Sequence, residues 1–296
     1  MTMSMRGYVP KSPWVEEQNI RIDCAGIPLL VFTGDWHYGH EGTNHKLLIE
    51  DIDVLKHCPP DVSPIVFLMG DLIDNAIRSA PGTAIAETVV RVKEQKDEVL
   101  ALCREIDDKI IGVIQGNHEE RSYREDDFEA SAWLANELGT PYFGAGTKIN
   151  LELVNDDSMI TKIVVLVGHT YSGAGAANKC RNFYNKRGPA DIVALAHMHT
   201  PYIGSEYIQD VQRIFCQCGT YQEFSRFFME NTLSSSKVAQ PAVAVFGEEK
   251  VPFLDFKTGI NTLTGKVAVK VDNSAKIAEV EAQIAWIKQK LEGGMK

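Results

Sequence analysis

Five short blocks of acidic, amide and imidazole residues occur along this chain, each at or just past the end of an apolar run. They are GDWH with Asp35 and His37, GDLID with Asp71 and Asp74, GNHEE with Asn117 and His118, GHT with His169, and AHMHT with His197 and His199. An apolar run of about four to eight residues is typical of a strand that is buried on both faces. Five of the eight histidines lie in these blocks, so the pattern predicts a two-metal site at the ends of several buried strands.

Length and composition place the chain among soluble globular proteins. It has 296 residues, of which 44% are hydrophobic and 24% charged, and no apolar run approaches the ~20 residues that a membrane span needs. The N-terminal stretch lacks the apolar core of a secretory signal, and the six cysteines form no CxxC pair. These features predict a cytoplasmic protein with free thiols.

Alternating strands and helices are predicted along the chain. Residues 85–106 follow helical spacing between two apolar runs, which makes a strand, helix, strand unit. A turn-forming cluster at 155–158 predicts a hairpin. The predicted strands are Ile27 to Thr33, Ile65 to Met69, Lys109 to Ile114, Lys148 to Val154, Thr161 to Val167, Asp191 to Leu195, Val211 to Cys218, and two within Ala242 to Phe256. This alternation favours an α/β fold with mixed sheets.

The chain divides into three predicted parts. Residues 1–26 are expected to be an N-terminal arm that is irregular over residues 1–18, residues 27–271 the main domain, and residues 272–296 a C-terminal helix. A short heptad pattern marks that helix, at Ile277, Val280, Ile284, Ile287 and Leu291. It is compatible with a helix packed on its own subunit and with one that joins subunits into a homo-oligomer.

The first two blocks carry ligand types that suit divalent cations. Asp35 and His37 are two residues apart at a strand end, where both side chains can converge on one ion; such oxygen and nitrogen ligands suit Mn, Fe, Zn or Ni. Asp71 is placed to bridge two cations with one oxygen on each, while Asp74 could orient a catalytic imidazole. An ordinary turn at Asp35 and a helix cap at Asp71 or Asp74 are the alternatives.

The third block combines a neutral ligand with a candidate acid. Asn117 offers an amide oxygen, and His118 can serve as a general acid without binding metal. Glu119 and Glu120 are expected to face water at the start of a helix, where acidic side chains are favoured by the helix dipole. Arg121 could contact a substrate phosphate or form a surface salt bridge.

The remaining histidines differ in how strongly they indicate a metal. His169 alone would fit a hydrogen-bonded core histidine equally well. The pair His197 and His199 is a stronger signal, because two imidazoles at alternating positions of a strand end are rarely placed together without a metal to share.

The ordered set of blocks resembles the calcineurin-like metallophosphoesterase superfamily, whose pattern is DxH, GDxx, GNH followed by Asp or Glu, an isolated His, and GHxH. The resemblance extends from about Phe32 to about Tyr221. It implies a four-layer α/β/β/α sandwich with two mixed sheets, to which the C-terminal helix is added. It also implies two divalent cations, with manganese favoured over iron, zinc, nickel or magnesium. The implied ligands are Asp35, His37, Asp71 and His199 for the first metal, and Asp71, Asn117, His169 and His197 for the second.

The same resemblance implies a mechanism and a branch within the superfamily. A hydroxide that bridges the metals would attack phosphorus, and His118, oriented by Asp74, would protonate the leaving oxygen. Two positions depart from the family pattern. Ala196 replaces the usual Gly before the final HxH, and Asn75 replaces the Arg of the protein-phosphatase branch, which counts against protein-phosphatase activity.

Three functions follow as hypotheses. The first is a phosphodiesterase acting on a small or flexible phosphodiester. The second is a nuclease that uses a basic and aromatic stretch as a strand-binding rim, although the net charge of −10 disfavours broad nucleic-acid binding. The third is a non-catalytic scaffold that keeps its metals for stability and acts through the C-terminal helix. The stretch of the second hypothesis contains Lys179, Arg181, Phe183, Tyr184, Lys186 and Arg187, with Arg181 and Arg187 as its candidate substrate contacts.

Overall fold

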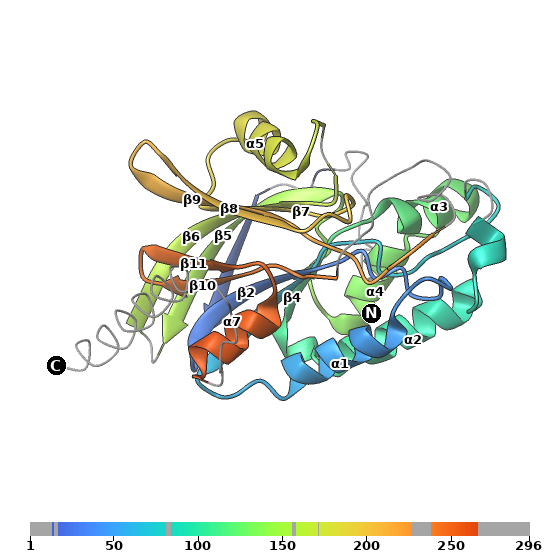
Figure 1. The fold of residues 1–296 in the computed structure, drawn as a ribbon, viewed down its shortest axis with the longest axis horizontal. Helices are drawn as coiled ribbons and strands as arrows, with labels where there is room; N and C mark the ends of the chain where they lie inside the picture. Colours follow the sequence, from blue (N-terminus) through green and yellow to red (C-terminus); the bar gives the residue numbers. More distant parts are fainter. Residues whose placement is uncertain are drawn as a thin grey trace, which may run out of the picture.

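Two β-sheets packed face to face form the centre of the molecule (Figure 1). The computed structural model describes residues 14, 17–80, 84–155, 158–170, 172–225 and 238–265. The six-stranded sheet has the order β1 (Gln18–Asp23), β5 (Gly146–Asn155), β6 (Ser158–Gly168), β7 (Ile192–Leu195), β9 (Val211–Gln217) and β8 (Tyr202–Ile208). The five-stranded sheet has the order β11 (Glu249–Phe253), β10 (Ala242–Phe246), β2 (Ile27–Thr33), β3 (Val62–Leu68) and β4 (Ile110–Val113).

Both sheets mix parallel and antiparallel pairs. In the five-stranded sheet β2, β3 and β4 are parallel, while β10 runs antiparallel to β2. In the six-stranded sheet β6, β7 and β9 are parallel, while β5 and β8 run antiparallel to their neighbours β6 and β9. The carboxyl ends of parallel strands meet at one edge of a sheet, so the blocks that follow β2, β3, β6 and β7 leave the sheets at such edges.

Helices cover the outer faces of both sheets, which makes four layers (Figure 1). The outer face of the five-stranded sheet packs against α1 (His45–Lys56), α2 (Val92–Arg104), α4 (Ala130–Leu138) and α7 (Phe256–Leu263). The outer face of the six-stranded sheet packs against α5 (Ala176–Arg187). The short helix α3 (Asn117–Asp126) follows β4 and contacts α4. The predicted α/β/β/α sandwich with two mixed sheets is confirmed.

Alternation along the strands separates the apolar cores. Leu29 and Val31 of β2 face the helices, whereas Leu30 and Phe32 face the other sheet, as expected from the two-residue period of a strand. Phe67 of β3 stacks on Phe32 with ring centroids 4.9 Å apart, and neither side chain is exposed. The inter-sheet core therefore fixes β2 and β3 against the six-stranded sheet, which is what positions the blocks at their ends.

Within the segment predicted as an N-terminal arm, residues 1–26, Gln18–Asp23 forms the edge strand β1, which pairs in parallel with β5. Its sequence, QNIRID, has only two apolar residues, and these alternate with polar ones. Ile20 and Ile22 pack against the inter-sheet core, so one face is buried and the other solvated. Further upstream, the Trp14 ring meets the Phe183 ring of α5 edge-on, with centroids 5.6 Å apart.

Other sequence predictions have mixed outcomes. The strands expected from the apolar runs are all present, and the six cysteines are free thiols, five of them buried. Among the described residues, no helix is long and apolar enough to cross a membrane. The C-terminal helix predicted over 272–296 lies outside the described residues.

Truncating Phe67 to Ala is expected to lower the free energy of unfolding by about 3–5 kcal/mol, because it removes a buried ring between the two sheets and leaves a cavity. Equilibrium denaturation in urea measures this. Ile49→Ala on α1 is the control: the Ile49 side chain is 50% exposed, and surface substitutions usually change stability by less than about 0.5 kcal/mol. Equal losses for both variants would contradict the assignment of Phe67 to the core.

Candidate metal centre

The chain segments that follow β2 and β3 continue side by side beyond the sheet. The Asp35 N–H donates to the Gly70 carbonyl at 2.9 Å, and the His37 N–H donates to the Asp71 carbonyl at 3.0 Å. From the other sheet, the His197 N–H donates to Asp35 Oδ2 at 2.7 Å. Backbone hydrogen bonds thus bring the first, second and fifth blocks together before any cation is considered.

The blocks are concentrated in left-handed backbone. Nine non-glycine residues of the described chain have positive φ, and six of them lie in or beside the blocks: Asp35 (51°), His37 (46°), Asp71 (51°), Asn75 (45°), His197 (74°) and His199 (55°). Asn, Asp and His are the side chains that tolerate this region best. Each such residue still costs on the order of 1–3 kcal/mol, and strain of this kind clusters at functional sites.

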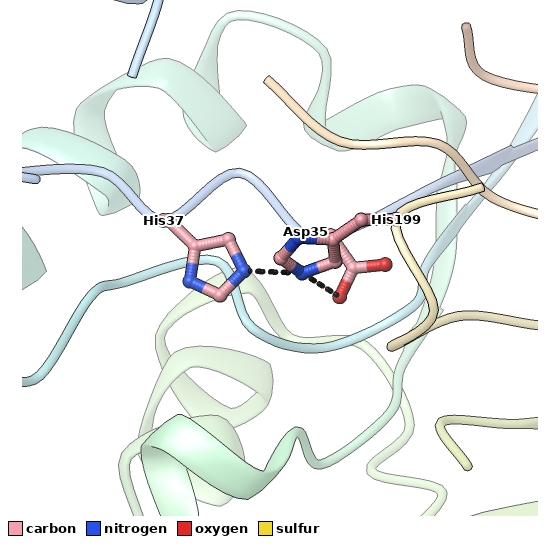
Figure 2. Close-up of side chains that lie close together, drawn as sticks. All are labelled: Asp35, His37 and His199. Carbon is pink, nitrogen blue, oxygen red and sulfur yellow. Dashed lines mark hydrogen bonds and ion pairs between the residues drawn. The ribbon is translucent and has the colours of Figure 1, made fainter. Parts of the chain in front are cut away.

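Asp35, His37 and His199 form one group of possible ligands (Figure 2). The Nε2 atoms of His37 and His199 lie 2.9 Å apart, and His199 Nε2 lies 3.7 Å from Asp35 Oδ1. Asp35 Oδ1 is buried and has no hydrogen-bond partner among the described residues. A buried carboxylate oxygen without a donor is costly, so this atom fits a position in which a cation is the missing partner.

Asp71, His169 and His197 form a second group. His169 Nε2 lies 3.1 Å from both Asp71 Oδ2 and Asn117 Oδ1, while His169 Nδ1–H donates to the Met69 carbonyl at 2.8 Å. That bond fixes the ring and directs Nε2 at the other ligand atoms, as carbonyl partners do for metal-binding histidines. The seven residues proposed as ligands from the sequence are therefore brought together by the fold.

The sequence predicted that each carboxylate oxygen of Asp71 would face one cation, but the two oxygens have different partners in the structure. Oδ1 accepts the His118 N–H at 2.8 Å, whereas Oδ2 faces the imidazoles of His169, at 3.1 Å, and His118, at 4.0 Å. The backbone bond occupies one oxygen because the turn after β3 packs directly on the start of α3. Oδ2 is therefore the Asp71 oxygen that faces the imidazoles.

Burial and neighbouring charges shift the pKa values of the histidines in the centre. Burial lowers the pKa of His197 to about 4 and that of His199 to about 3, so both rings are neutral and ready to bind a cation at pH 7. Burial also acts to lower the pKa of His169, but Asp71 and Asp35 outweigh it and raise the pKa to about 10. His169 therefore holds the proton that offsets the carboxylate charge in the protein without metal.

His118 is held by the main chain of Asp74. Its Nδ1–H donates to the Asp74 carbonyl at 2.6 Å, while Asp74 Oδ1 lies 3.6 Å from Nδ1. The Asp74 carboxylate instead accepts a hydrogen bond from Thr88 Oγ1 at 3.2 Å. Because a carbonyl can only accept, the bond fixes the proton of the neutral ring on Nδ1 and leaves Nε2 toward the centre. Burial lowers the pKa of His118 to about 4.

The expectation that Glu119 faces water is wrong. Its side chain is 3% exposed, and its carboxylate accepts the N–H groups of Asp71 at 2.9 Å, Leu72 at 2.7 Å and Ile73 at 3.2 Å. An acid in the first turn of a helix is usually solvated, and only the packing of α3 against the turn after β3 buries this one. Glu120 does lie at the surface, where it pairs with Arg124.

The three candidate substrate arginines have different surroundings. Arg121 is half-buried on α3, and its Nη1 donates to the carbonyls of Asp74 at 3.0 Å and Asn75 at 3.4 Å. Arg181 forms a salt bridge with Glu206, and the Arg187 guanidinium lies 4.0 Å from the centre of the Trp14 ring. The structure therefore brings only Arg121 to the main chain beside His118.

The basic stretch on α5 does not present a free aromatic and cationic rim. Phe183 is 2% exposed and belongs to the core beneath α5. The Tyr184 ring meets Phe215 edge-on, with centroids 5.9 Å apart. Aromatic and cationic residues alternate here because α5 packs one of its sides on the six-stranded sheet. The sequence of α5 alone does not reveal which of its residues face the sheet.

Both departures from the family pattern have a structural explanation. Ala196 is 1% exposed, and its methyl group belongs to the inter-sheet core. The Asn75 side chain donates to the His118 carbonyl at 2.6 Å and to Ser122 Oγ at 2.9 Å, and its N–H donates to Gln95 Oε1. Asn75 therefore ties the second block to α3. Gln95 and Thr88 are further residues that support the centre, and neither stands in a sequence pattern that marks it.

Comparison with known proteins agrees with this geometry. A family model described as calcineurin-like phosphoesterase matches residues 29–207, more than half of the chain. No curated protein sequence matches the chain.

Several solved structures are similar in fold. A single mutant of Vps29 from Entamoeba histolytica is 13% identical with a TM-score of 0.42, covering 76% of this chain and 99% of that one. Chaetomium thermophilum Vps29 is 10% identical with a TM-score of 0.40, covering 77% and 94%. A metallophosphoesterase from Sphaerobacter thermophilus is 13% identical with a TM-score of 0.39, covering 77% and 87%.

Binding of Mn²⁺ is expected to release protons and to tighten as the pH rises from about 6.5 to about 8.5, because a cation must displace the proton that His169 holds up to its pKa of about 10. Calorimetric titration of the metal-free protein, in two buffers with different heats of ionisation, measures both the affinity and the proton count. An affinity that is constant or falls with rising pH would contradict this assignment.

Proposed function

The chain belongs to the calcineurin-like phosphoesterase family, and from this premise we propose that it is a divalent-metal-dependent phosphodiesterase. The observation that carries the proposal is the convergence of three overlapping groups of possible ligand atoms. They are Asp35 with His37 and His199, His37 with Asp71 and His118, and Asp71 with His169 and His197. Within each group the ligand atoms lie within 4.8 Å of one another. Neither a fold core nor a surface ion-pair network requires so many buried imidazoles at one place.

The donor set suits two divalent cations. Asp35, His37, Asp71 and His199 would hold the first, and Asp71, Asn117, His169 and His197 the second. Mixed carboxylate, amide and imidazole donors favour first-row cations such as manganese, with iron, zinc and nickel as close alternatives. When bound, such cations polarise phosphoryl oxygens and lower the pKa of water so that a nucleophile is available near neutral pH.

His118 is proposed as the general acid. Its ring is fixed by the 2.6 Å bond from Nδ1–H to the Asp74 carbonyl, so Nε2 carries a proton only in the imidazolium form. His118 therefore has to take up a proton from solvent on Nε2, which an anionic phosphoester beside it would favour, before it can pass that proton to a leaving oxygen. Nε2 lies 4.0 Å from Asp71 Oδ2, beside the residues that would hold the cations. The role of Asp74 is to orient the ring, and it does so through its main-chain carbonyl rather than through its carboxylate.

Arg121 is proposed to contact a phosphate oxygen of the substrate. It lies one helical turn after His118, and two carbonyl acceptors hold its Nη1 atom. The remaining guanidinium nitrogens are left to bind an anion, in the fork geometry that suits phosphate. Asn75 cannot replace the arginine of the protein-phosphatase branch in this role, because its side chain is committed to α3. This difference favours a diester over a phosphoprotein substrate.

Purified protein is expected to hydrolyse bis(p-nitrophenyl) phosphate when reconstituted with Mn²⁺, and to lose the activity on chelation. His118→Asn should reduce kcat by about 10²–10⁴-fold, because it removes the general acid, while Mn²⁺ affinity is retained. The release of p-nitrophenolate measures the rate. If neither this diester nor p-nitrophenyl phosphate is hydrolysed with Mn²⁺, Ni²⁺, Zn²⁺ or Mg²⁺, the enzyme proposal fails and the scaffold hypothesis is favoured.

Replacing Arg121 with Ala is expected to lower kcat/KM for the diester by about tenfold or more, since hydrogen bonds to a charged group are worth about 1.5–3 kcal/mol. Arg124→Ala is the matched control on the same helix, because Arg124 is exposed and pairs with Glu120. Steady-state kinetics of both variants provide the test. Unchanged kinetics for Arg121→Ala would show that this side chain serves only to bind the carbonyls of Asp74 and Asn75.

A further inference from the structure

Glu119 closes the turn that carries Asp71. The turn bends through left-handed backbone at Asp71, where φ is 51°, so the N–H groups of three successive residues point to one place. Glu119 Oε2 accepts the Asp71 N–H at 2.9 Å, and Oε1 accepts the N–H groups of Leu72 and Ile73 at 2.7 and 3.2 Å. A buried carboxylate with three backbone donors is a strong, directional contact.

The contact is reciprocal. Asp71 Oδ1 accepts the His118 N–H at 2.8 Å, so the carboxylate of the turn satisfies a free N–H at the start of α3, while the carboxylate of α3 satisfies the turn. The fit is close enough to exclude a side chain between them: a Cβ on Gly116 would lie 2.1 Å from Asp71 N and 2.4 Å from Glu119 Oε2. We call this paired arrangement of Asp71 and Glu119 the carboxylate lock.

The carboxylate lock positions more of the ligands in one group than in the other. Asn117 is the first residue of α3, and its Oδ1 reaches within 3.1 Å of His169 Nε2 only because the start of α3 is docked on the turn. Asp35, His37 and His199 come from segments after β2 and β7, which meet the lock through Asp71 alone: the Asp71 carbonyl accepts the His37 N–H at 3.0 Å. The other group takes both Asp71 and Asn117 from the lock. The geometry therefore points to Glu119 as a positioning residue that sets the affinity of the cation site formed by Asp71, Asn117, His169 and His197. This inference rests on the proposed metal centre.

Glu119→Gln is the variant that isolates this role. Glutamine has nearly the same shape but a single acceptor oxygen, and its amide group donates, so the three N–H donors can no longer all be satisfied. Asp191→Asn is the matched control. Asp191 also uses a carboxylate oxygen to accept a backbone N–H, from Val164 at 2.8 Å, but it lies at the start of β7, the end away from His197.

The test is a titration of the metal-free full chain with Mn²⁺. Binding is measured by calorimetry and by the electron paramagnetic resonance signal of the free ion. The unaltered protein is expected to bind two ions. In Glu119→Gln one of the two affinities should fall by about 10–100-fold, the usual effect of losing a group that orients a ligand, while the other, whose site shares Asp71 but not Asn117, should fall less. Asp191→Asn should retain both affinities even if its melting temperature falls.

Three results would overturn the inference: two unchanged affinities in Glu119→Gln, equal weakening of both, or a matching loss in Asp191→Asn. An unaltered protein that binds no Mn²⁺ would instead refute the metal centre itself, and the inference with it. A second measurement needs no variant. Amide exchange at Asp71, Leu72 and Ile73 should already be slow in the metal-free protein, because Glu119 and not the cation closes the turn; fast exchange there would also overturn the inference.

Discussion

Every buried donor and acceptor at the ends of β2, β3, β6 and β7 has to find a partner, and this requirement shapes the centre of the molecule. An unpaired buried charge costs several kcal/mol, yet carboxylates and imidazoles are crowded here away from water. The chain responds by bending its main chain so that N–H groups reach carboxylates, as at Asp71 with Glu119 and Asp35 with His197. Among the residues that the structure describes, Asp35 Oδ1 has no hydrogen-bond donor, and a cation would complete the set.

Both sheets contribute ligands to the candidate site. Asp35, His37, Asp71 and Asn117 follow strands of the five-stranded sheet, whereas His169, His197 and His199 follow strands of the six-stranded sheet. The apolar layer between the sheets therefore does more than stabilise the fold: the stacked rings of Phe32 and Phe67 belong to the packing that sets the relative position of the two half-sites. Bound cations would in turn join the sheets at that edge, so folding and metal binding are expected to be coupled.

The parts that sequence reasoning predicted are those governed by local pattern. Buried strands such as Ile27–Thr33 could be predicted because their apolar runs end at turns. The convergence of the blocks could be predicted because the blocks follow strands whose ends meet at one edge of a sheet. Gln18–Asp23 was missed because an edge strand with one solvated face has few apolar residues. Glu119 was misinterpreted because its partner, the turn after β3, lies far away in sequence. Long-range packing decides whether a charged side chain is solvated, and no local spacing encodes it.

The left-handed backbone at Asp35, His37, Asp71, His197 and His199 also limits how such a chain can change over evolutionary time. Asn, Asp and His, which tolerate this conformation best among the residues with a side chain, are also residues that bind cations. Selection for the backbone conformation and selection for cation binding therefore favour the same residue types at these positions. At these positions a substitution by a residue of another type would therefore cost both a turn and a potential ligand.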